Sequence, residues 1–220
     1  TAKVNVKVAD TDYTEELTDT VPGNSTDSST VYEFTDPLQP RFKTRNLRLQ
    51  FLSDGTGVPG INWAVTPDPN HRVKDAQPRA GITEGPGYVE QVLYPGNYYL
   101  TLTSPKGDLG DMYTFEDAPR TVNIDSRTNM PVREVSLRKN PGRITGRVVY
   151  DNNEPVANAL VRAGLEATRT NSAGYYTLDR VAAGTDLVTV DDAADRSYAG
   201  ASKAITALKP AQAQSLDNIT

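Results

Sequence analysis

Hydrophobic and polar residues alternate along short stretches of this chain. Residues 2–8 read AKVNVKV, with alanine or valine at every second position and lysine or asparagine between them. The same period of two returns from residue 46, where Leu47, Leu49 and Phe51 fall on one face. Because successive side chains of a strand point to opposite faces, this period predicts half-buried β-strands.

Further strands are predicted between clusters of turn-forming residues. They are short, recur at a spacing of roughly ten residues and are bounded by Gly, Pro, Asn and Asp, a pattern typical of β-sandwiches. The alanine-rich stretch 192–209 is the one place where the pattern favours a helix. The predicted strands span residues 61–66, 88–94, 97–103, 112–116, 120–125 and 132–138, then a strand opening at 143, and 159–164, 175–179, 186–190, 203–208 and 214–219.

Two parts of the chain share a spaced pattern of residues. Residues 59–65 align with 155–161, which makes Trp63 and Ala159 equivalent inward positions. The repeat predicts two tandem domains of one fold, joined near residues 139–142. The other matched positions are Thr83 and Thr170, Gly87-Tyr88 and Gly174-Tyr175, and Gly96 and Gly184.

Charge separates the N-terminal segment from the rest of the chain. The 220 residues carry a net charge of −5, and residues 1–40 alone hold two lysines and eight acidic side chains. Residues 9–30 are rich in Asp, Thr, Ser and Glu and are predicted to form a long loop or mobile arm, and 31–34 a short strand. We therefore expect an all-β protein, with an extended acidic arm over 1–42 and Ig-like β-sandwiches over 43–140 and 141–220.

The composition excludes several kinds of chemistry. Without cysteine there is no disulfide, thiol nucleophile or Cys-ligated zinc, and the single histidine, His71, excludes a two-histidine metal site. No G-x-S-x-G motif is present, so His71 is read as a loop residue. No apolar run reaches the length of a membrane-spanning helix, and the acidic balance argues against nucleic-acid binding. No enzyme is expected; a pair of loop carboxylates is the remaining enzymatic alternative.

Tyrosines and a basic group are the candidate interaction residues. In a strand, neighbouring side chains point to opposite faces, so one tyrosine of each adjacent pair is expected in the core and the other on the surface. An exposed tyrosine can contact another chain or stack on a glycan. The basic group is predicted to dock an acidic segment of another subunit. The predicted surface comprises Tyr98, Tyr99, Tyr175, Tyr176, Arg41, Lys43 and Arg45.

Acidic loops are the only candidate metal sites. Calcium takes six to eight oxygen ligands, and none of these loops has the spacing of an EF-hand. No cofactor is therefore expected, with Ca²⁺ as the alternative. The loops hold Asp10, Asp12, Glu15 and Glu16; Asp108, Asp111, Glu116 and Asp117; and Asp191, Asp192 and Asp195.

The second copy resembles a known family. It reads ITGRVVYDNNEPVANALV, then TRTNSAGYYTL and VAAGTDLVTV, and over residues 143–190 it is similar to the carboxypeptidase regulatory-like domain, a transthyretin-like β-sandwich. The first copy resembles this domain through residues 57–59, 83–88 and 93–98. The related collagen-adhesin B-type domain forms a Lys–Asn isopeptide bond from a lysine on its first strand. Because the corresponding strands carry Arg48 and Gln50, or Arg143 and Arg147, no such bond is expected.

The resemblance implies a non-catalytic spacer or binding module of a secreted, cell-surface or virion protein. We expect first a structural assembly protein, such as a virion decoration, cement or tail-appendage subunit. It would dock on a lattice through its arm and sandwich faces, with other protein subunits as partners in a homo-oligomer or lattice. The alternative is a bacterial secreted or cell-surface module for adhesion or carbohydrate binding. Both place the protein on a virion surface or outside the cell, without membrane insertion.

Overall fold

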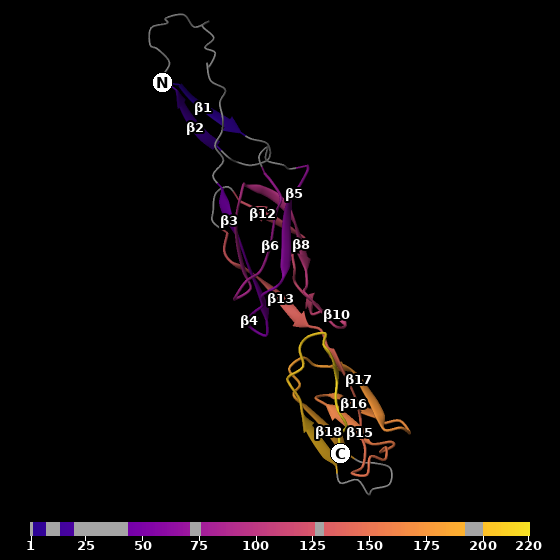
Figure 1. The fold of residues 1–220 in the computed structure, drawn as a ribbon. Coiled ribbons are helices and arrows are strands. Elements are labelled where there is room, and N and C mark those ends of the chain that lie inside the picture. Colours follow the sequence, from indigo (N-terminus) through magenta and orange to yellow (C-terminus); the bar gives the residue numbers. More distant parts are fainter. Residues whose placement is uncertain (1, 8–13, 20–43, 71–75, 126–129, 192–199) are drawn as a thin grey trace, which may run out of the picture.

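The protein is built of β-strands throughout the part that the computed structural model describes, which is residues 2–7, 14–19, 44–70, 76–125, 130–191 and 200–220. The predicted all-β class is therefore confirmed. Two β-sandwiches lie end to end, and the C-terminus lies at the end of the second sandwich that points away from the first (Figure 1).

Two strands of the acidic segment pair with each other. β1 (Ala2–Lys7) and β2 (Thr14–Asp19) are antiparallel, with Ala2 opposite Asp19 and Lys7 opposite Thr14. The strand predicted at 2–8 is thus confirmed, whereas the prediction of a continuous loop over 9–30 is wrong at β2. Pairing with β1 makes a strand of a polar sequence that shows no alternation of its own. The segment 31–34 lies outside the described residues.

The first sandwich places its first strand in the middle of one sheet. β3 (Arg45–Ser53) pairs antiparallel with β7 (Tyr88–Leu93) and parallel with β13 (Arg133–Lys139). β4 (Thr56–Gly57) and β11 (Tyr113–Phe115) extend this sheet. The facing sheet has the order β12 (Thr121–Ile124), β8 (Gly96–Thr103), β5 (Asn62–Pro67) and β6 (Arg79–Ile82), and a hairpin of β9 (Lys106–Gly107) and β10 (Gly110–Asp111) follows β8.

The second sandwich repeats this arrangement with fewer residues. β14 (Gly142–Arg147) lies between β17 (Tyr175–Val181), which is antiparallel to it, and β20 (Ala213–Ser215), which is parallel. The facing sheet has the order β16 (Glu166–Arg169), β15 (Leu160–Ala163), β18 (Leu187–Asp191) and β19 (Ala201–Ala204). Strand by strand, β3, β5, β6, β7, β8, β12 and β13 of the first sandwich correspond to β14, β15, β16, β17, β18, β19 and β20 of the second.

Each sandwich has its own hydrophobic core. In β3 the inward residues Leu47, Leu49 and Phe51 are fully buried and alternate with half-buried polar ones, as the sequence pattern predicts. One cluster of buried apolar residues lies between Leu47 and Leu137 and the other between Ile144 and Ile219. The predicted domain limits, 43–140 and 141–220, remain a prediction, which these two clusters support.

A buried threonine occupies the same place in both sandwiches. Thr83 Oγ1 accepts a hydrogen bond from the Ile61 amide (2.9 Å) and donates one to the Val58 carbonyl (3.0 Å). In the second sandwich, Thr170 Oγ1 accepts from the Ala159 amide (2.9 Å) and donates to the Val156 carbonyl (2.6 Å). In each sandwich the hydroxyl thereby satisfies two backbone groups of the segment just before β5 or β15, which explains why threonine recurs in the repeat.

The same hydrogen bonds correct the register predicted for the repeat. Because Ile61 and Ala159 make matching bonds, the position equivalent to Trp63 is Val161 and not Ala159. The alignment of 59–65 with 155–161 is therefore wrong by two residues. The matches of Thr83 with Thr170 and of Gly87 with Gly174 agree with the structure. Both glycines have a positive φ. The Gly87 carbonyl accepts a hydrogen bond from the Phe51 amide, and the Gly174 carbonyl accepts one from the Val148 amide.

Several elements differ from the predicted ones. Residues 201–204 form β19, so the helix considered for 192–209 is absent from the described residues 200–209; 192–199 lie outside the description. The strand predicted at 203–208 is thus shorter and begins earlier. β6 and β16 were not predicted, because Arg79–Ile82 and Glu166–Arg169 lie at sheet edges and show little apolar alternation.

Candidate interaction surfaces

The acidic loops do not form a metal site in the described residues. No group of three or more His, Asp or Glu side chains lies close enough there to hold a metal ion. Asp111 pairs with Lys106 at 2.8 Å and Glu116 with Arg138 at 3.6 Å. Asp191 approaches Arg162 at 3.8 Å. His71, Asp10, Asp12, Asp192 and Asp195 lie outside the description, and of Glu15 and Glu16 only the strand pairing is described.

The two tyrosine pairs divide between core and surface as predicted. Tyr98 and Tyr176 are 2 % and 3 % exposed, whereas Tyr99 and Tyr175 are 45 % and 56 % exposed. Tyr98 and Tyr176 are therefore core residues and cannot belong to an exposed surface. Whether Tyr99 and Tyr175 bind a partner remains a prediction.

Burial gives both core tyrosines a raised pKa. Desolvation raises the pKa of Tyr98, although its hydroxyl donates a hydrogen bond to the Tyr94 carbonyl at 2.9 Å. Desolvation raises the pKa of Tyr176 to about 12, and its hydroxyl has no hydrogen-bond partner among the residues that the structure describes. A neutral phenol avoids the cost of a buried charge, so these two groups stay protonated at neutral pH.

Of the predicted basic group, Arg45 is the one residue that the structure describes. This residue is half-buried at the start of β3, and its Nη1 donates to the Thr44 carbonyl at 3.2 Å. Arg41 and Lys43 lie outside the described residues. Docking of an acidic segment by this group therefore remains a prediction.

The arginines of the two first strands lie on the outer faces of their sheets. Arg48 pairs with Glu90 of β7 at 2.9 Å, and Arg143 pairs with Asp179 of β17 at 2.6 Å. The core-facing positions of the same strands hold apolar residues, Leu49 in β3 and Ile144 in β14. Neither of these first strands holds the lysine that such an isopeptide bond requires.

Tyr175 contacts an arginine on the outer face of the second sandwich. The Arg147 guanidinium lies 5.4 Å from the centre of the Tyr175 ring, within the range of a cation–π contact. Arg147 Nε also donates to the Ala173 carbonyl at 2.9 Å. The contact holds the exposed ring against the sheet, beside a depression of about 360 Å³ that Thr145 and Ser215 also line.

At the outward strand positions that the structure describes, the outer face of the sheet β12-β8-β5-β6 carries no charged side chain. Each of the other three outer faces carries an ion pair between an arginine and an acidic residue. Ile82 and Tyr99 are 61 % and 45 % exposed on this uncharged face. Its outward residues are Thr121 and Asn123 of β12, Asn97, Tyr99, Thr101 and Thr103 of β8, Asn62, Ala64 and Thr66 of β5, and Ala80 and Ile82 of β6.

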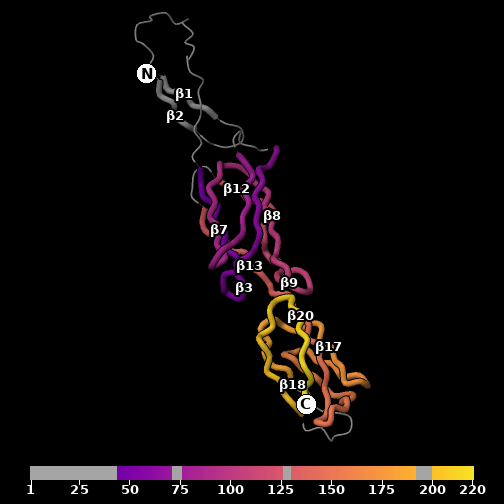
Figure 2. The backbone as a smooth tube through the Cα atoms, viewed as in Figure 1, coloured from indigo at the N-terminus to yellow at the C-terminus, as the bar shows by residue number. Residues whose placement is uncertain are grey.

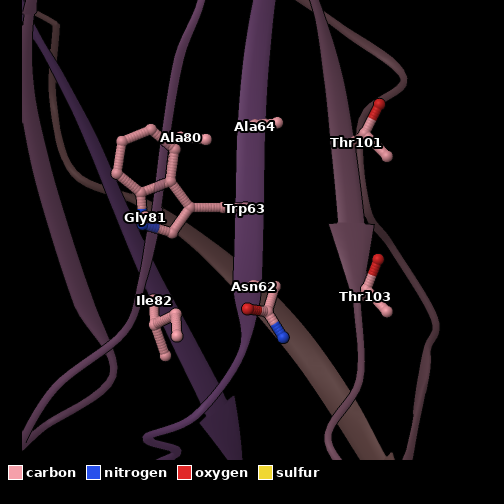
Figure 3. A pocket seen from close by; sticks show the side chains of 8 residues that line it. All are labelled: Asn62, Trp63, Ala64, Ala80, Gly81, Ile82, Thr101 and Thr103. Carbon is pink, nitrogen blue, oxygen red and sulfur yellow. The ribbon is translucent and has the colours of Figure 1, made fainter.

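A shallow depression of about 400 Å³ lies at one end of this uncharged face. Figure 3 shows Thr101 and Thr103 one above the other along β8, on the far side of β5 from the indole. The Trp63 side chain extends from β5 away from these two threonines and packs against Gly81 (Figure 3). It is 8 % exposed and belongs to the core. A side chain at Gly81 would strike the Trp63 ring, because a Cβ there would lie 2.9 Å from it.

Sequence reasoning did not find the uncharged face. Its residues come from four strands, and one of them, β6, was not predicted. The available signal was the run of outward threonine and asparagine in residues 97–103, which contains no charge in a chain that is 23 % charged.

One family model matches the second sandwich. Residues 143–220 match the family model of the carboxypeptidase regulatory-like domain. The resemblance recognised over 143–190 is thereby confirmed, and it extends to the C-terminus. The matched residues make up most of the second sandwich.

The solved structures that match the chain share little sequence with it. The Bacillus anthracis TIE protein is 13 % identical at a TM-score of 0.45 over 80 % of this chain and 34 % of that one. A streptococcal ancillary pilin is 13 % identical at 0.37 over 79 % and 62 %, and a shaft pilin of Lactobacillus rhamnosus GG is 12 % identical at 0.36 over 81 % and 98 %. The chain thus spans about a third of the first of these structures. None of the curated proteins compared with the chain matches it. In the described ranges no helix has the length and apolarity needed to cross a membrane.

Proposed function

We propose that the protein is a non-enzymatic structural unit of a surface-exposed protein assembly, in which the two sandwiches hold other parts of the assembly apart. The path of the chain carries this proposal. β3 begins at the end of the first sandwich that lies away from the second, and residue 220 lies at the opposite end of the molecule (Figure 2). A segment with this path separates whatever is joined to its two ends by the length of both sandwiches.

The chemistry of the described residues supports a structural role. Several exposed carboxylates, such as those of Glu90 and Asp111, pair with arginine or lysine. The two buried tyrosines have raised pKa values, which makes them poor proton donors and acceptors at neutral pH. The two buried threonine hydroxyls bond backbone groups. These groups therefore stabilise the fold and are not arranged around a substrate.

Immunogold labelling tests the structural role and its setting. Antibodies against the second sandwich are applied to intact cells of the source and to purified virions. A labelled fibre or lattice on cells supports the bacterial-surface alternative, and a labelled virion supports the role expected first from the sequence. Label found only in the cell interior would contradict both.

Deletion of residues 1–40 tests the role of the acidic arm. We expect both sandwiches to stay folded, because the core residues that the structure describes all lie between Leu47 and Ile219. Incorporation into the assembly should fall, since the arm is proposed to dock on a neighbouring subunit. Loss of the first sandwich on deletion would show that the arm is part of its fold.

Glycan binding is a second candidate function, and the uncharged face favours it. Threonine and asparagine offer neutral donors and acceptors, and exposed Tyr99 offers a ring on which a sugar can stack. A neutral oligosaccharide could cover this face without stranding a charge. On a glycan array, Tyr99→Ala and Thr101→Lys should abolish any binding that the matched control Tyr175→Ala retains; an array on which the unmodified protein binds nothing would exclude this function.

A further inference from the structure

We infer that the β9–β10 hairpin of the first sandwich clamps residues 209–213 of the second, so that the two sandwiches form one rigid body. The hairpin lies at the end of the first sandwich that faces the second (Figures 1 and 2). The inference holds whether or not the proposed function is correct, because it depends only on contacts within the chain.

Two hydrogen bonds join the hairpin directly to the second sandwich. The Leu109 amide donates to the Ala211 carbonyl at 2.9 Å. The Ala213 amide donates to Asp108 Oδ2 at 2.9 Å. These bonds are separate from the covalent connection at residues 140–142, so the sandwiches are attached at two places.

Asn140, in the covalent connection, is itself fixed on both sides. Its side chain accepts a hydrogen bond from Thr114 Oγ1 and donates one to the Asp111 carbonyl, each at 2.7 Å. Its amide donates to the Met112 carbonyl at 2.9 Å. Its carbonyl accepts from the Ala211 amide at 3.0 Å. The connection is therefore bound at Asn140 to both sandwiches.

Ala211 uses both of its backbone polar groups to bind the first sandwich. Its φ is +51°, a left-handed conformation that costs an alanine free energy. The side chain is 2 % exposed, and the conformation directs the amide to Asn140 and the carbonyl to Leu109. A strained and buried residue at this position is expected where the contact itself holds the conformation.

The hairpin approaches Ala211 so closely that one of its residues must be glycine. A Cβ on Gly107 would lie 2.8 Å from the Ala211 carbonyl oxygen and 3.0 Å from the Pro210 carbonyl oxygen. Both neighbours are backbone atoms, which cannot move aside without moving the loop. A side chain at Gly107 would therefore act as a wedge between the two sandwiches.

The clamp also couples the second sandwich to the first. Ala213 is the first residue of β20, and it pairs with Arg143 of β14. Asp108 thus satisfies a backbone amide at the start of the last strand of the other sandwich. Loosening the hairpin should therefore make the beginning of β20 more mobile and let the orientation of one sandwich relative to the other vary.

Residual dipolar couplings of the full chain test the clamp. In the unmodified protein, couplings from both sandwiches should fit one alignment tensor. Gly107→Val should require two different tensors, while the dispersed amide resonances of each sandwich show that both remain folded. Asp108→Ala removes one clamp bond and should increase the difference between the rotational correlation times of the two sandwiches. Asp117→Ala, an exposed aspartate outside the clamp in the same sandwich, is the matched control and should behave as the parent.

Two results would overturn the inference. One is a parent chain that already needs two independent tensors. The other is a Gly107→Val chain that still fits a single tensor, since the wedge would then not separate the sandwiches. If Gly107→Val does not fold, Asp108→Ala decides, and correlation times equal to those of the parent would count against the clamp.

Discussion

Replacing Thr83 by valine removes a hydroxyl while keeping the shape of the side chain. The Ile61 amide and the Val58 carbonyl then lose the partner that lies at 2.9 and 3.0 Å. Thr83 is 2 % exposed, so water cannot replace the hydroxyl without opening the core. Because each unsatisfied buried polar group costs about 1–3 kcal/mol and two such groups result, Thr83→Val should lower the free energy of unfolding by about 2–6 kcal/mol.

Trp63 makes this effect measurable in one sandwich. It is the only tryptophan of the chain and lies in the first core, so its fluorescence follows the unfolding of that sandwich during a urea titration. The midpoint should fall strongly in Thr83→Val, whereas Thr170→Val should act on the second sandwich, followed by its amide resonances. Thr101→Val, on the exposed face of β8, is the control and should change stability by less than about 0.5 kcal/mol.

Thr83→Ser separates the hydroxyl from the methyl group. Serine keeps both hydrogen bonds and loses one methyl, which costs about 1 kcal/mol. The reasoning requires valine to be clearly more destabilising than serine. If the two variants have the same midpoint, the hydroxyl does not carry the stability assigned to it.

Three further predictions concern the same fold. Burial raises the pKa of Tyr176 from 10.0 to about 12, so the contribution of Tyr176 to stability should be constant below pH 10 and become unfavourable as the pH rises towards 12, because this tyrosine ionises first in the unfolded chain; Tyr176→Phe should remove this part of the alkaline loss in urea titrations between those pH values, and leave the part due to Tyr98. Gly174→Ala should cost more than about 2 kcal/mol in thermal unfolding, because its Cβ would overlap the Val148 carbonyl at a φ of +78°, whereas Gly55→Ala, with open space at +73°, should cost only about 1–2 kcal/mol. Arg48→Ala should change stability by less than about 1 kcal/mol and show little salt dependence, since its ion pair with Glu90 is exposed.

The strands were predictable wherever one face is buried and the other is solvated. In β3 the alternation gives the element and the inward residues Leu47, Leu49 and Phe51 directly. β6 and β16 escaped prediction, because an edge strand can be polar on both faces and still pair through its backbone. The repeat could be recognised because certain turns need a side-chain hydroxyl or a positive φ, and these needs select threonine and glycine at matching positions of both sandwiches.

The register of the repeat could not be obtained from alternation. A slip of two residues leaves every side chain on its original face, so the pattern fits Trp63 opposite either Ala159 or Val161 equally well. Only the hydrogen bonds of Thr83 and Thr170 distinguish the two. The uncharged face was missed because it combines strands distant in sequence. The clamp was missed because each of its hydrogen bonds involves a backbone group, and the residue types do not indicate which backbone groups meet.

The parallel pairing of first and last strands determines how the protein responds to tension. A pull on the two ends of the first sandwich draws β3 and β13 in opposite directions along their length, and in the second sandwich it does the same to β14 and β20. The hydrogen bonds between such strands lie across the load and must break together, whereas those of a hairpin pulled open at one end break one at a time. Each sandwich should therefore resist forced extension better than its equilibrium stability alone suggests, and the shorter pair, β14–β20, should give way first.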